Sequence, residues 1–64
     1  MLKPTPALTI DQRQAIFAAL VTAQDRHAGD VAGARQRVAR QFKVAESEVR
    51  QIENEGLEAG WPLP

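Results

Sequence analysis

The segment from Arg35 to Leu57 constrains what this chain can fold into more than any other part of it. Apolar residues recur there at helical spacing in two stretches, which are joined by the three residues from Lys43 to Ala45. The inward positions of the two stretches hold Val38, Phe42, Val49 and Ile52. Ala39 falls where the two helices would cross most closely, and a larger side chain there would push them apart. The pattern therefore predicts a helix-turn-helix.

The outward positions of the second stretch carry polar side chains that can hydrogen-bond the base edges or phosphates of DNA. They are Glu46, Ser47, Arg50, Gln51 and Asn54. Arg50 could bind guanine O6 and N7, and Gln51 could pair with adenine N6 and N7. Glu46 could accept a hydrogen bond from cytosine N4, but we favour a role beside the helix dipole, where it would also repel phosphate. For Arg50 and Gln51 we favour DNA contact over plain solvent exposure.

Basic residues cluster in the same segment, although the formal net charge of the chain is zero. Five of the eight Lys and Arg side chains lie within sixteen positions, namely Arg35, Arg37, Arg40, Lys43 and Arg50. Such side chains could contact the phosphate backbone, which positions a protein without reading sequence. They cannot all face DNA, because Arg37 and Arg40 lie on one side of their helix and Arg35 on another. For each of them, ordinary solvent exposure is the alternative.

Three helices are predicted in all, over Ile10–Arg26, Val31–Phe42 and Glu46–Glu55. Thr9 and Gln12 fit a capping box at the start of the first. Gly29 suits its end, and Asp30 suits the cap of the second helix. No strand pattern or internal repeat is visible, so we expect an all-α, small three-helix bundle.

Two helix boundaries stay open at this point. Gly33 weakens the first turn of the second helix and would move its start towards Ala34. Either Gly56 or Gly60 could end the third helix.

We expect one domain over residues 8–60, with a short segment on either side. Pro4 and Pro6 disfavour a helix in residues 1–7, which we expect to form an extended arm. Residues 61–64, Trp-Pro-Leu-Pro, form a Pro-rich tail that cannot continue a helix. Trp61 could cover the small core or anchor a partner, and we favour the first because so short a chain needs the buried area.

Composition argues against several classes of protein. The chain has no cysteine, so disulfides and thiolate metal sites are excluded. A single serine, a single histidine and no tyrosine leave no plausible nucleophile–base pair, so we expect no enzyme and no cofactor. His27 lies near a helix end, where a dipole or capping role is expected instead of metal binding. No membrane-spanning run or signal peptide is visible, so a cytoplasmic protein is expected.

The stretch from Val38 to Leu57, VARQFKVAESEVRQIENEGL, resembles the helix-turn-helix in region four of the main bacterial sigma factors. The shared elements are Gln-Phe before the turn, Val after it, and Val-Arg-Gln-Ile-Glu followed by a Leu. The likeness extends weakly back to Leu8. It implies a last helix in the major groove, a promoter element as ligand and docking on RNA polymerase. Arg50 and Gln51 match positions of the family that touch DNA.

The chain also departs from that family at several positions. Glu46 and Ser47 stand where the family commonly has Arg then Glu, so a different DNA sequence is expected. Ala45 replaces the usual Thr or Ser cap, and Lys43 stands where many helix-turn-helix proteins have Gly. No other sigma region is present, so we expect a free-standing DNA-binding protein that cannot melt a promoter.

The function predicted from the sequence is sequence-preferring binding of double-stranded DNA in transcription control. A single module of this size buries too little area on DNA for high affinity, so we expect a homodimer or another protein as partner. The first alternative is a protein-interaction module that contacts RNA polymerase or a sigma factor. The second is an oligomeric protein that organises DNA without sequence preference.

Overall fold

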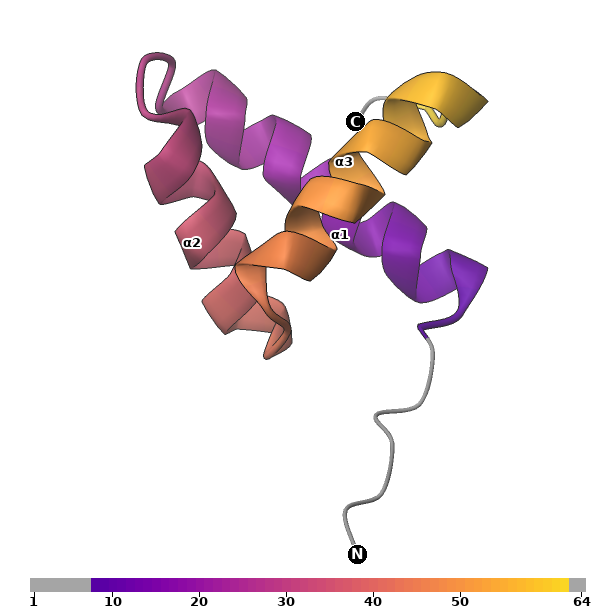
Figure 1. The fold of residues 1–64 in the computed structure, drawn as a ribbon. Coiled ribbons are helices and arrows are strands. Elements are labelled where there is room, and N and C mark those ends of the chain that lie inside the picture. Colours follow the sequence, from indigo (N-terminus) through magenta and orange to yellow (C-terminus); the bar gives the residue numbers. More distant parts are fainter. Residues whose placement is uncertain (1–7, 63–64) are drawn as a thin grey trace, which may run out of the picture.

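The computed structural model describes residues 8–62, which form three helices that pack pairwise against one another (Figure 1). They are α1 (Ile10–Arg26), α2 (Val31–Phe42) and α3 (Glu46–Ala59). The described residues contain no strand, and the predicted all-α fold with three helices is confirmed. The predicted extended arm, residues 1–7, lies outside the described residues, as do residues 63–64 of the predicted tail.

Side-chain caps fix the starts of the first two helices. The Gln12 backbone N–H donates to Thr9 Oγ1 at 3.1 Å and the Thr9 N–H donates to Gln12 Oε1 at 2.8 Å, which confirms the capping box. At α2, the Gly33 N–H donates to Asp30 Oδ1 at 3.0 Å. This cap starts α2 at Val31 and not nearer Ala34, so Gly33 does not shorten the helix. A Cβ at Gly33 would overlap the capping carboxylate, and glycine leaves room for it.

The end of α3 differs from the predicted one. The helix continues four residues past Glu55, to Ala59, and ends where Gly60 adopts a left-handed conformation (φ 69°). Gly56 lies within the helix and is buried. Its Cα faces the ring of Phe17. A Cβ at that position would overlap the ring, so Gly56 serves a close approach of α3 to α1 and does not end the helix.

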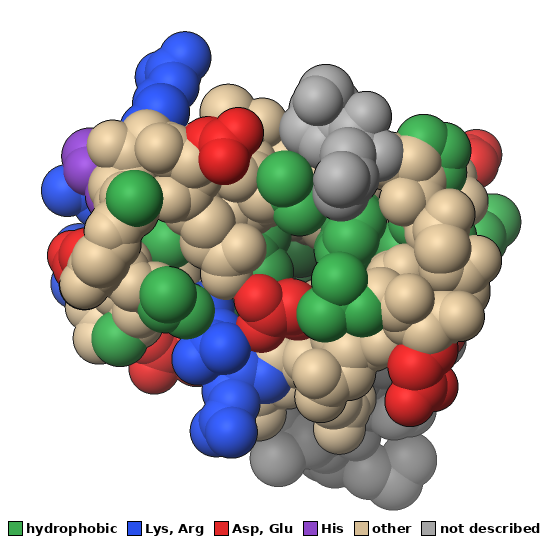
Figure 2. All heavy atoms as spheres, turned by 90° about the horizontal axis from the view of Figure 1, so that it is seen from above, with side chains coloured by type: hydrophobic (Ala, Val, Ile, Leu, Met, Phe, Trp, Pro, Cys, Tyr) green, Lys and Arg blue, Asp and Glu red, His purple; other side chains and the backbone are tan. Residues whose placement is uncertain are grey.

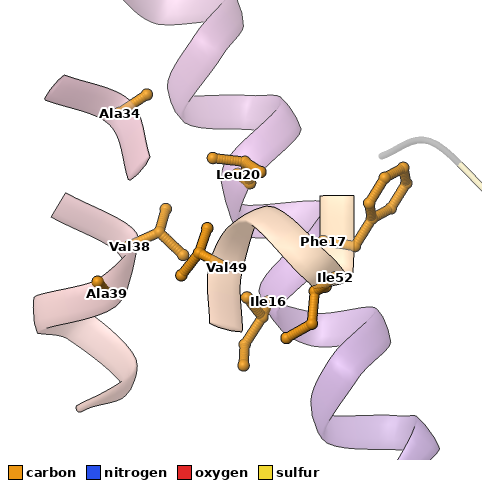
Figure 3. Close-up of a cluster of buried hydrophobic side chains, with 8 residues drawn as sticks. All are labelled: Ile16, Phe17, Leu20, Ala34, Val38, Ala39, Val49 and Ile52. Carbon is orange, nitrogen blue, oxygen red and sulfur yellow. The ribbon is translucent and has the colours of Figure 1, made fainter. Parts of the chain in front are cut away.

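The core takes residues from all three helices and is closed at one side by Trp61. Its buried hydrophobic members are Ile16, Phe17, Leu20, Ala34, Val38, Ala39, Val49 and Ile52. Figure 3 shows Val38 of α2 and Val49 of α3 pointing toward each other. The half-buried Trp61 ring meets Phe17 edge to face, with centroids 5.7 Å apart. The expectation that Trp61 covers the core is therefore confirmed, whereas Phe42 is only half-buried at the edge of the core.

Candidate nucleic-acid interface

The connection between α2 and α3 is a short turn with one left-handed residue. Lys43 has φ 56° and ψ 46°, a conformation that costs a non-glycine residue about 1 kcal/mol. The Val44 N–H donates to the Ala39 carbonyl oxygen at 3.0 Å, so the chain stays tied to the end of α2 as it reverses. Ala45 then occupies the N-cap of α3 and gives no side-chain hydrogen bond. Three residues thus fix how α3 lies against α2.

The two faces of α3 have opposite characters. Val49 and Ile52 are 0% and 2% exposed, so they seal one face of the helix to the core. The predicted outward positions are all exposed, namely Glu46, Ser47, Arg50, Gln51 and Asn54. Within residues 8–62, none of these five side chains forms a hydrogen bond or an ion pair with another residue. Their polar atoms are therefore available to a ligand.

A groove runs between α2 and the first half of α3, and basic side chains surround it. It consists of two adjoining hollows of about 510 and 370 Å³, which share Gln36 and Glu46. The remaining lining residues are Ala32, Arg35, Ala39, Arg40, Lys43, Val44, Ser47 and Arg50. Of the ten described lining residues, four carry a positive charge and Glu46 alone is acidic. We call this surface the α2/α3 groove. An anionic strand such as a phosphate backbone would be attracted to it.

One acidic side chain on α3 links all three helices just behind this groove. The Glu53 carboxylate accepts hydrogen bonds from Arg35 Nη2 of α2 at 2.9 Å and from Gln24 Nε2 of α1 at 2.8 Å. Burial alone would raise the pKa of Glu53. The hydrogen bonds from Gln24 and Arg35 and the charges of Arg35 and Arg50 outweigh it and hold the pKa below 4.5. Seen from above the view of Figure 1, basic and acidic side chains lie side by side on the surface (Figure 2).

Arg35 differs from the other side chains that were predicted to contact the phosphate backbone of DNA, because it is paired with Glu53. Its guanidinium donates two hydrogen bonds to Glu53 and its side chain is only 29% exposed, so it holds α2 against α3. Sequence reasoning missed this link, because Gln24 and Arg35 precede Glu53 by 29 and 18 residues. No local pattern pairs residues at such separations.

Arg37 lies apart from Arg40 and Lys43. Its Nη1 is 3.4 Å from His27 Nε2, and both residues line a different hollow, between α1 and α2. Although Arg37 and Arg40 are both exposed on α2, they therefore border different surfaces. DNA contact by Arg37 stays a prediction. His27 is the C-cap residue of α1, and the described residues contain no cluster of three or more groups that could hold a metal ion.

The chain matches no known family model, no curated protein and no solved structure. The likeness to sigma region four therefore rests on the residues quoted above. Of the described helices, none combines the length and the apolar character needed to cross a membrane.

Proposed function

We propose that this protein binds double-stranded DNA with sequence preference, as a small regulator of transcription in the cytoplasm. In this proposal α2, the turn and α3 form a helix-turn-helix, and α3 enters the major groove. The observation that carries it is the exposed polar face of α3, whose side chains have no partner within residues 8–62, beside the basic α2/α3 groove. The apolar face of α3 is packed on the core and its other face is polar and exposed, which suits insertion into a groove of DNA.

The side chains divide into two proposed roles. Arg50 and Gln51 contact base edges, with Ser47 and Asn54 beside them on the same exposed face. Arg40 and Lys43, which line the groove at the end of α2, contact phosphates and set the position of α3. Glu46 lies between these two groups. Its negative charge would repel a phosphate there and would restrict which bases can lie beside it.

The affinity of one copy for DNA is expected to be modest. A single module of this kind buries about 600–1,000 Å². The net charge of zero gives little long-range attraction to DNA. We therefore propose a second copy or another protein at the DNA site; a symmetric dimer would place two half-sites about one helical turn apart.

The deciding experiment is selection of bound sequences from a pool of random duplex DNA. The wild-type protein is expected to enrich a motif, and Arg50→Ala is expected to lose enrichment at one or two base pairs. Arg13→Ala is the matched control, because Arg13 lies on α1 outside the α2/α3 groove and its ion pair with Glu55 is exposed to water. If no motif is enriched, or if Arg50→Ala enriches the same motif as the wild type, base reading by α3 is wrong.

A second candidate is a module that binds RNA polymerase or a sigma factor and hardly binds DNA alone. The net charge of zero and the acidic residues after Gln51, namely Glu53, Glu55 and Glu58, favour contact with another protein over contact with DNA. Capture of purified polymerase without a gel shift at low salt would favour this candidate. Equal affinity for unrelated duplexes, falling steeply with salt, would instead favour the oligomeric DNA-organising alternative.

A further inference from the structure

The hollow between α1 and α2 has an apolar floor and a basic rim. Small side chains of both helices form the floor, namely Ala18, Ala19, Ala23 and Val38. Arg26, His27 and Arg37 lie around it, together with Thr22 and Gln41. The hollow measures about 410 Å³, and none of the described residues that line it carries a carboxylate. We call it the α1/α2 hollow. Its chemistry suits a protruding apolar side chain that has a carboxylate next to it.

The last turn of α3 presents that combination. Leu57 is the most exposed large hydrophobic residue of the described chain, at 68%. Glu58 follows it, is exposed, and forms no ion pair within residues 8–62. The two other acids nearby are already engaged, Glu53 by Arg35 and Glu55 by Arg13. The C-terminal end of a helix also carries partial negative charge, which adds to that of Glu58.

We propose that the last turn of α3 in one copy of this chain docks into the α1/α2 hollow of a second copy. Leu57 would enter the apolar floor, and Glu58 would meet Arg37 at the rim. The charges select this arrangement over a symmetric one. Two α3 ends placed together would bring Glu58 against Glu58, whereas an α3 end placed on the hollow brings opposite charges together.

The contact joins two different surfaces, so one copy keeps its hollow free and the other keeps the last turn of its α3 free. Repetition of such a contact builds a ring or an open row and not a closed symmetric dimer. Leu57 lies seven residues beyond Arg50, about 10 Å further along the helix. Residues i and i+7 share a face of a helix, so the contact lies at the far end of the face proposed for DNA, beyond Asn54. It does not depend on DNA binding and is tested without DNA.

Sedimentation velocity over a range of protein concentrations tests the proposal. One apolar side chain and one rim charge pair make a small contact, so we expect a dissociation constant on the order of 0.1–1 mM. Leu57→Ala is expected to weaken association about tenfold, because it removes the side chain that would be buried. A sedimentation coefficient that does not change with concentration, or one unaffected by Leu57→Ala, would overturn the proposal.

Charge exchange separates this contact from other modes of association. Arg37→Glu and Glu58→Arg are each expected to weaken association by roughly three- to tenfold, and the double variant is expected to recover it, because the two charges exchange places. Asp11→Arg is the control, since it changes the net charge as much as Glu58→Arg does at an exposed position outside the hollow. Circular dichroism melts establish that each variant is folded. If Leu57→Ala abolishes association but the double variant fails to recover it, Leu57 meets some other surface and the hollow is not its site.

Discussion

A single glycine decides how closely α3 approaches α1. Gly56 is buried near the C-terminal end of α3, three residues before its last residue, and a Cβ there would overlap the ring of Phe17. Replacing a glycine inside a helix with alanine ordinarily stabilises by about 1 kcal/mol. Here we expect the reverse, a loss of about 1–2 kcal/mol in the free energy of unfolding, because the overlap forces α3 and α1 apart. Urea unfolding of Gly56→Ala, followed by the fluorescence of Trp61, measures the change.

A double-mutant cycle ties that loss to the ring. Phe17→Leu removes ring atoms and leaves a gap, so Gly56→Ala is expected to cost less in that background than in the wild type. Stabilisation of the wild-type protein by Gly56→Ala would mean that the ring of Phe17 moves aside freely. The same contact explains why the end of α3 could not be predicted from the sequence. A glycine signals a helix end locally, whereas the need for Gly56 comes from a ring 39 residues earlier in the chain.

Of the three helices in residues 8–62, only α3 begins without a side-chain cap. Thr9 and Asp30 cap α1 and α2, but Ala45 at the N-cap of α3 has no oxygen to offer. Ala45→Ser is therefore expected to raise the free energy of unfolding by about 1 kcal/mol, which is a rise of roughly 4–8 °C in Tm. Ala28→Ser, in the exposed turn before α2, is the control and should leave Tm nearly unchanged. Equal shifts in Tm for the two variants would show that the backbone N–H groups at the start of α3 gain nothing from a side-chain cap.

The helices themselves were predictable because their signals are local. The Thr9–Gln12 capping box, the Asp30 cap and the spacing of apolar residues gave the bounds of α1 and α2. The exposure of Arg50 and Gln51 also followed from spacing, since Val49 and Ile52 fix which face of α3 is buried. What spacing could not predict is how the three helices are joined by polar contacts, because those partners are distant in the chain.

One carboxylate holds the three helices together. Glu53 of α3 accepts hydrogen bonds from Gln24 of α1 and from Arg35 of α2, and a second ion pair, Arg13–Glu55 at 3.3 Å, joins α1 to α3 on an exposed edge. The exposed pair is screened by water and contributes little. The Glu53 link is largely shielded from water, and it fixes the positions of α2 and α3 on which the α2/α3 groove depends.

The same carboxylate makes the stability of the fold sensitive to acid. Its pKa is lowered in the folded protein, so around that pKa the unfolded state binds more protons, and acid favours unfolding. The stabilisation by Glu53 is fully present above pH 4.5 and is lost as the pH falls through the lower folded value. Glu53→Gln lacks this charge at every pH. We therefore expect the wild type to be the more stable at pH 7 and the difference between the two to shrink below pH 4.5. Urea unfolding of both proteins across this range measures it, with the exposed Glu58→Gln as control. A difference that stays constant with pH would mean that the charge of Glu53 does not hold the three helices together.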